Sequence, residues 1–161
     1  MAEYSAQEII ETHQRLIDTR QRIVAGELGW GALADFFTDE GTFVDPAWGR
    51  IDGRENIRKF LEESMQGLED WSFPHEWEAV IGDRLMTGWQ NRLPGRRPDG
   101  GYWQAPGVSR FVYAGGGRFS FEHDVLNMAQ VFEIMKESGW KPKTRMHQPP
   151  RNPVRVYGWD L

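Results

Sequence analysis

Three carboxylates occupy positions from which acid–base chemistry is feasible: Asp45, Glu122 and Asp124. Asp45 ends a short alternating run, residues 42–45, and the alternation puts it on the same strand face as Phe43. A carboxylate on an inward face is unfavourable unless it is paired, solvated or used. In the last predicted strand the same alternation places Glu122 and Asp124 on one face.

If these carboxylates meet in one apolar pocket, they cannot all ionise, because burial and like charge raise at least one pKa. One carboxyl group can then donate a proton while another accepts one. Such a pair can enolise a ketone, close a ring by aldol chemistry or expel water, and this chemistry needs no metal and no cofactor. Positioned acid–base groups contribute on the order of 10²–10⁴ in rate.

Each candidate also has a purely structural interpretation. Asp45 precedes Pro46, and an Asp-Pro pair commonly shapes a turn. Glu122 and Asp124 could instead pair with arginines on an exposed sheet face. His13, on the apolar stripe of the first helix, is either an interior histidine or part of a pocket wall, and the orientation of His75 stays open. No set of His, Asp and Glu residues has the spacing of a metal site.

Helices and hairpins position these side chains. Ser5 and Glu8 form a capping box that starts a helix ending near Gly26. Further helices are predicted over Trp30–Phe37, over about Arg54–Gln66, and from the N-cap Asn127 to near Gly139. Glycine-containing turns join two pairs of strands, which predicts an α+β architecture; the strands are Ser72–Ile81, Arg84–Leu93, Tyr102–Tyr113 and Arg118–Leu126. A polar turn, 94–101, is expected to project from the rim.

Composition limits the class of protein. A chain of 161 residues is expected to form one domain with room for an internal pocket. The net charge of −5 and a pI near 5.4 argue against nucleic-acid binding, which needs a basic surface. There are no cysteines, no secretory leader and no apolar run of membrane-spanning length, so we expect a cytoplasmic protein without a membrane partner.

The last residues differ from the rest. Prolines exclude a continuing helix, so residues 1–139 are expected to form the domain and residues 140–161 an extended Pro-rich, basic arm. The apolar tip, 154–159, is expected to dock on this subunit or on a partner. His147 lies in the arm and is expected to be solvated.

The stretch from Phe36 to Phe60 closely resembles the signature of SnoaL-like and ketosteroid-isomerase-like proteins of the nuclear transport factor 2-like superfamily. It contains an acidic turn, a short strand, Asp45-Pro46, a loop and a glycine-led helix. The resemblance extends to about Ser138. It implies a cone-shaped, curved mixed β-sheet wrapped around helices, an α+β barrel of cystatin-like type, with a pocket inside.

The resemblance also implies roles for individual residues. Asp45 falls where ketosteroid isomerases carry their proton-shuttling aspartate. The face that carries Glu122, Asp124 and Leu126 lines the cavity in these proteins, and SnoaL-like cyclases place an acid–base aspartate near Asp124. Ser109 matches the position of a protonated acid in the oxyanion hole.

We therefore expect Asp45 to act as base and Asp124 to act as acid or partner, with Glu122 tuning it. Ser109 and Tyr113 are expected to bind the substrate oxygen, and the pocket wall is expected to comprise Phe43, Trp48, Trp89, Phe111, Leu126 and His13. The substrate is expected to be a small, mainly apolar, oxygenated molecule, and the protein a homodimer through its sheet. Two alternatives stay open: a non-catalytic ligand-binding or interaction module, and an epoxide hydrolase with a carboxylate-activated water.

Overall fold

Capping groups in the sequence set the ends of the helices. In the computed structural model, which describes residues 3–155, helix α1 spans Ala6–Val24 and begins where the Ser5 side chain accepts a hydrogen bond from the Glu8 N–H. Helix α2 spans Arg54–Ser64, and α3 spans Met128–Ser138 behind the N-cap Asn127, which accepts from Gln130 N–H. The predicted second helix is present as a 3₁₀ helix, η1, at Trp30–Phe36.

One six-stranded sheet forms the rest of the fold, in the order β2-β1-β6-β5-β4-β3. Strands β1 and β6 are parallel, and all other neighbours are antiparallel. The strands are β1 (Phe37–Asp45), β2 (Gly49–Asp52), β3 (His75–Ile81), β4 (Arg84–Arg96), β5 (Tyr102–Gly115) and β6 (Arg118–Leu126). Both predicted hairpins are confirmed. The loop expected after Asp45 instead contains β2, which is too short to show an alternating pattern.

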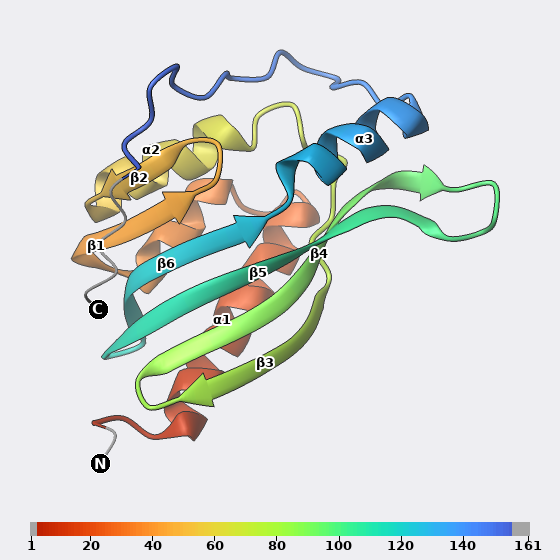
Figure 1. Cartoon of the computed structure of the whole chain (residues 1–161). Helices are drawn as coiled ribbons and strands as arrows, with labels where there is room; N and C mark the ends of the chain where they lie inside the picture. The colour runs from red at the N-terminus through yellow and green to blue at the C-terminus, as the bar shows by residue number, and fades with distance from the viewer. Residues whose placement is uncertain (1–2, 156–161) are drawn as a thin grey trace.

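The curved sheet wraps around the helices (Figure 1). Helix α1 packs along the concave face, α2 lies near β1 and β2, and α3 lies across the end of β6. The hairpin between β4 and β5 extends well beyond the sheet, as expected for the polar turn 94–101 (Figure 1).

Two apolar clusters make up the core. The larger one joins α1, η1 and α2 to the inner sheet face; its members include Ile9, Leu16, Leu33, Phe37, Phe43, Ile57, Phe60, Leu85, Phe111 and Phe119. The smaller one lies beneath α3 and contains Trp71, Leu93, Ala105, Val131 and Ile134. Burying a large apolar side chain contributes roughly 1.5–3 kcal/mol, so these clusters hold the helices against the sheet.

The chain after α3 has no regular secondary structure through residue 155, as predicted. We call residues 140–155 the C-terminal strap. It runs from α3 across the top of the molecule toward β2 (Figure 1). Thr144 donates to Glu69, and the Arg50 N–H donates to the Val154 carbonyl at 2.9 Å. Residues 156–159 of the predicted tip lie outside the described part of the chain. Among residues 3–155, no helix is long and apolar enough to span a bilayer.

Candidate active site

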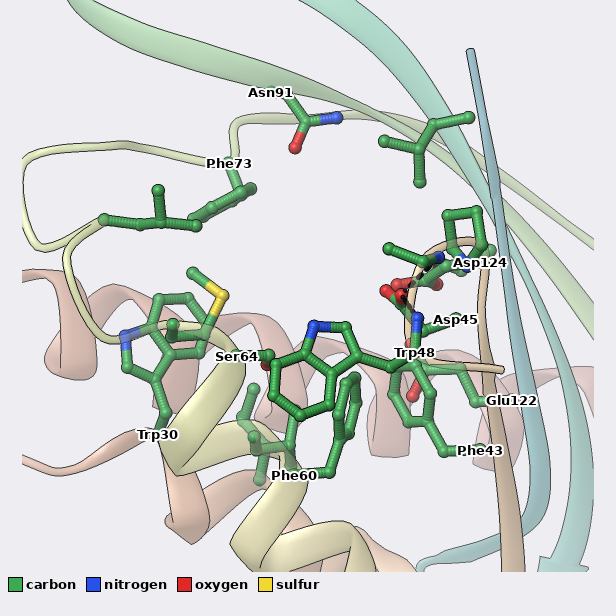
Figure 2. A pocket seen from close by; sticks show the side chains of 18 of the residues that line it. Trp30, Phe43, Asp45, Trp48, Phe60, Ser64, Phe73, Asn91, Glu122 and Asp124 are labelled. Atoms are coloured by element: carbon green, nitrogen blue, oxygen red, sulfur yellow. Dashed lines mark hydrogen bonds between the residues drawn. The ribbon is translucent and has the colours of Figure 1, made fainter. Parts of the chain in front are cut away.

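A cavity of about 340 Å³ lies between the two apolar clusters. This volume is within the range of small-molecule sites, roughly 300–1,000 Å³. All the predicted wall residues line it: Phe43, Trp48, Trp89, Phe111, Leu126 and His13. Further aromatic side chains, among them Trp30, Phe60 and Phe73, complete the wall (Figure 2).

The three predicted carboxylates line this one cavity. Parallel pairing of β1 with β6 places Phe43 opposite Glu122 and Val44 opposite His123, which brings Asp45 to the level of Asp124. Figure 2 shows Asp45, Glu122 and Asp124 together on one side of the cavity. The charge of Asp45 acts on Asp124. Acids some eighty residues apart in sequence thus meet in an apolar hollow.

Asp124 is held by a chain of hydrogen bonds. The register pairs it with Ser109, whose hydroxyl donates to Asp124 Oδ1 at 2.5 Å. The Trp89 indole N–H donates to the same hydroxyl oxygen at 2.8 Å. Burial raises the pKa of Asp124 to about 7, with the Ser109 hydrogen bond opposing this shift and the charge of Asp45 adding to it. Ser109 therefore contacts the candidate acid directly, in addition to lining the cavity.

Glu122 is more strongly perturbed. Burial first, and the charge of Asp124 second, raise its pKa well above the usual range for a glutamate. The hydrogen bond between the two side chains favours a proton on Glu122 and negative charge on Asp124. The pair therefore shares protons near neutral pH, as expected for two carboxylates confined together.

Asp45 fits both of its interpretations. Its Oδ1 accepts hydrogen bonds from the backbone N–H groups of Ala47 and Trp48, each at 2.7 Å, so it shapes the turn. Its side chain also lines the cavity. Burial raises the pKa of Asp45, while the two backbone donors and Arg155 lower it. Among the described residues, Oδ2 has no hydrogen-bond partner and is available for chemistry.

Arg20 of α1 is a cavity residue that the sequence interpretation missed. Its positive charge acts on Glu122 and Asp124, and burial lowers its pKa from the usual arginine value. The signal was present in the sequence. Arg20 follows His13, Leu16 and Ile17 on the apolar stripe of α1. A charged side chain is unusual on the buried face of an amphipathic helix.

The two histidines near α1 have different positions. His13 is 1% exposed, lines the cavity, and contacts Glu78 Oε2 through Nδ1 at 2.5 Å. Burial lowers the pKa of His13 to about 4, so the imidazole is neutral and Nδ1–H donates to Glu78. His75 contacts the Thr87 hydroxyl at 3.0 Å and is not among the residues that line the cavity.

Tyr113 does not line the cavity, contrary to expectation. Its hydroxyl donates to Glu8 at 2.7 Å and accepts from the Gly117 N–H at 2.9 Å, at the N-terminal end of α1. The β5–β6 register shifts at Tyr113, beyond the level of the carboxylates. His147 was expected to be solvated; it is exposed, but it borders the cavity with Met146 and the two residues that follow it.

Two further polar groups on the wall lack partners. Asn91 Nδ2 and Trp71 Nε1 are buried, and neither has a hydrogen-bond partner within residues 3–155. Asn91 projects into the cavity across from Asp124 (Figure 2). In the same part of the chain, no group of three or more His, Asp or Glu side chains is placed to hold a metal ion.

Comparison with known proteins places this chain in a family. The sequence profile of the SnoaL-like domain matches residues 21–120. No curated protein sequence matches the chain. Among solved structures, a protein named as a SnoaL-like polyketide cyclase from Jannaschia sp. CCS1 has 17% identity and a TM-score of 0.62, covering 83% of this chain and 96% of its own.

Two other structures have the same architecture. An LEH-like epoxide hydrolase from M. tuberculosis has 15% identity and a TM-score of 0.60, covering 81% of this chain and 91% of its own. A protein with the ketosteroid isomerase-like fold from Catenulispora acidiphila has 18% identity and a TM-score of 0.56, covering 79% and 97%. These likenesses confirm the nuclear transport factor 2-like α+β fold. Since the domain profile spans more than half of the sequence, the chain belongs to the SnoaL-like family.

Proposed function

We propose that this protein is an enzyme that carries out acid–base chemistry on a small, mainly apolar, oxygenated substrate, using side chains alone. The observation that carries the proposal is the meeting of Asp45 and Asp124 in one cavity, with the pKa of Asp124 raised to about 7. A group that titrates near the working pH is suited to both giving and taking a proton. Isomerisation, dehydration and cyclisation all follow from such a site.

The surroundings of each carboxylate suggest its role. Asp45 keeps Oδ2 free and receives two backbone hydrogen bonds on Oδ1, which favour its charged form and fix its direction. It is therefore the base that removes a proton from a carbon next to a carbonyl group. Asp124 and Glu122 share protons and return one to the substrate, while Ser109 holds Asp124 in position.

One observation favours epoxide opening as a second candidate. The charge of Asp45 acts on Asp124, yet no hydrogen bond joins the two side chains directly in the described part of the chain. A water held between them could be deprotonated by Asp45 while Asp124 protonates the epoxide oxygen. The fold shared with the LEH-like epoxide hydrolase is in keeping with this reaction.

An assay with two surrogate substrates, a ketone and an epoxide, separates these functions. The protein is incubated in D₂O with β-tetralone, and loss of the α-proton signal is followed by proton NMR; styrene oxide is tested in parallel for diol formation. We expect catalysed exchange or hydrolysis that Asp124→Asn and Asp45→Asn abolish. The control is Asp18→Asn, which changes an exposed carboxylate on α1.

The outcomes discriminate clearly. Exchange alone supports enolisation, and diol alone supports epoxide opening. If the wild-type protein catalyses neither reaction, or if both site variants keep full activity, the enzyme proposal is wrong. The remaining interpretation is then a ligand-binding module of the same fold.

We also propose a homodimer formed through the outer face of the sheet. Large apolar side chains are exposed there: Trp77 is 45% exposed, Ile81 73% and Val125 48%. Strand alternation places these three opposite the inward residues. Exposed apolar patches of this kind mark association surfaces. Light scattering tests this: Ile81→Arg is expected to give monomers, whereas Val24→Arg on α1 leaves a dimer, and a monomeric wild type contradicts the proposal.

A further inference from the structure

The Arg20 guanidinium is the charged group of the cavity that the proposed proton transfers leave unused. It lines the cavity, and its side chain keeps intermediate exposure. Within residues 3–155 it makes no hydrogen bond and no ion pair, and it feels Glu122 and Asp124 only through their charge. Its N–H groups therefore have no hydrogen-bond acceptor among the described residues of the cavity wall.

Leaving such donors unpaired is unfavourable. An arginine carries five N–H donors in a rigid, planar fork, and it keeps its charge in proteins. A charged group removed from water needs an acceptor, and a carboxylate or a similar planar oxyanion matches the fork through two parallel hydrogen bonds. The cavity thus contains a cationic group whose N–H donors are available to an oxyanion of a bound molecule.

The neighbouring acids do not prevent an anion from binding. Burial, the charge of Asp124 and the hydrogen bond between the two side chains raise the pKa of Glu122 and so favour its neutral form, which lowers the negative charge of the cluster. Asp124 can take up a proton at neutral pH when a second anion arrives, because its own pKa is about 7. The cluster therefore adapts its charge to a ligand that Arg20 holds.

The far wall provides a second polar contact. Asn91 is 6% exposed and lines the cavity; its Oδ1 points into the cavity and accepts no hydrogen bond from the described residues, whereas its Nδ2 is buried in the wall (Figure 2). Asn91 lies across the cavity from Asp124 (Figure 2). Aromatic side chains cover the wall between these two poles. A ligand that pairs with both groups has an apolar body, an oxyanion at one end for Arg20 and a hydroxyl group at the other end that donates to Asn91 Oδ1.

We propose that the cavity binds an organic acid: an aromatic or alicyclic molecule whose carboxylate or acidic enol oxygen pairs with Arg20, and whose distal oxygen is bound by Asn91. This inference names a substrate class for the proposed function, and it rests on that function because it takes the same cavity as the active site. Its test measures binding only, so that it can fail while the acid–base activity stands, and the reverse.

Matched pairs of probes test the charge requirement. Binding of β-naphthoate and biphenylcarboxylate to the full chain is measured by calorimetry against their neutral amides. Wild-type protein is expected to bind the acids at least tenfold more tightly. Arg20→Gln is expected to lose that preference, weakening the acids by roughly 10- to 100-fold with little effect on the amides, since a hydrogen bond to a charged group has about that worth. Arg22→Gln, an exposed position on the same helix, is the control.

A third probe tests the second contact. The para-hydroxylated biphenylcarboxylate is expected to bind more tightly than its parent, and Asn91→Leu is expected to remove that gain while keeping the preference for acids over amides. Circular dichroism confirms that each variant is folded, and Arg20→Lys, which retains the charge, keeps part of the preference. The proposal is overturned if neither acid binds, if acids and amides bind equally to the wild type, or if Arg20→Gln keeps the wild-type preference.

Discussion

Replacing Ser109 by alanine should make Asp124 harder to ionise. The Ser109 hydroxyl donates to Asp124 Oδ1 at 2.5 Å, and this bond lowers a pKa that burial otherwise raises. Ser109 is 4% exposed, so water does not readily replace the lost donor. In the wild-type protein the Trp89 indole N–H donates to Ser109, so this group would also lose its acceptor in the variant.

The size of the effect follows from two values. A hydrogen bond to a charged acceptor contributes about 1.5–3 kcal/mol, and one pKa unit corresponds to about 1.4 kcal/mol. In Ser109→Ala the pKa of Asp124 is therefore expected to rise from about 7 by roughly one to two units. In the proposed reaction, the pH profile of proton exchange would move to higher pH together with the pKa of Asp124.

The measurement is a carbon NMR titration of protein labelled at aspartate side-chain carboxyl carbons, with Asp124→Asn used to assign the signal. Ser120→Ala is the control, since Ser120 lies on β6 outside the cavity lining and, within residues 3–155, its hydroxyl donates only to the Val112 carbonyl, at 3.4 Å. A pKa that stays the same or falls in Ser109→Ala would refute the view that this hydroxyl stabilises the ionised carboxylate.

Three other predictions concern Asp45, Asp124 and the strap. Asp45→Asn should abolish proton exchange with β-tetralone while thermal melting changes little, because the amide oxygen still accepts both backbone N–H groups; Asp45→Ala should also lower the melting temperature. The pKa of Asp124 is raised in the folded state, so between about pH 4 and 7 the folded protein holds a proton on Asp124 that the unfolded chain has lost. The free energy of unfolding is therefore expected to fall as the pH rises through that window. Chemical denaturation should show a smaller fall in Asp124→Asn, and an equal fall would contradict the assignment. Gly49→Ala would place a Cβ 2.5 Å from the Val154 carbonyl oxygen, so faster hydrogen exchange is expected across the strap; Gly26→Ala, with the same φ of +80° and nothing within 4 Å, is the control and should leave strap exchange unchanged.

Local sequence patterns predicted much of the fold because its determinants are local. Ser5 and Asn127 are caps that act within one turn, and both hairpins carry glycine turns between alternating runs. Alternation also placed Glu122 and Asp124 on a common face. That Asp45 joins them depends on the parallel pairing of β1 with β6, which the strand pattern does not specify. The family resemblance implied a shared pocket for these residues without giving this pairing.

The errors come from features that depend on the whole fold. Tyr113 has the right parity for the inner face, but a register shift and the length of β5 carry it past the cavity to Glu8. Arg20 was passed over because a helix stripe shows which side is buried without showing what that side faces. His147 borders the cavity only because the strap returns over the domain, which no periodicity encodes.

The turn that holds Asp45 is also where the strap is fastened. Arg155 donates to the Pro46 carbonyl oxygen at 3.1 Å, and the strand that begins at Gly49 holds Val154 through the N–H of Arg50. The strap is therefore bonded to the backbone on either side of Ala47 and Trp48, whose N–H groups hold Asp45 Oδ1. A change that displaces the strap would therefore also disturb the direction in which the Asp45 carboxylate points.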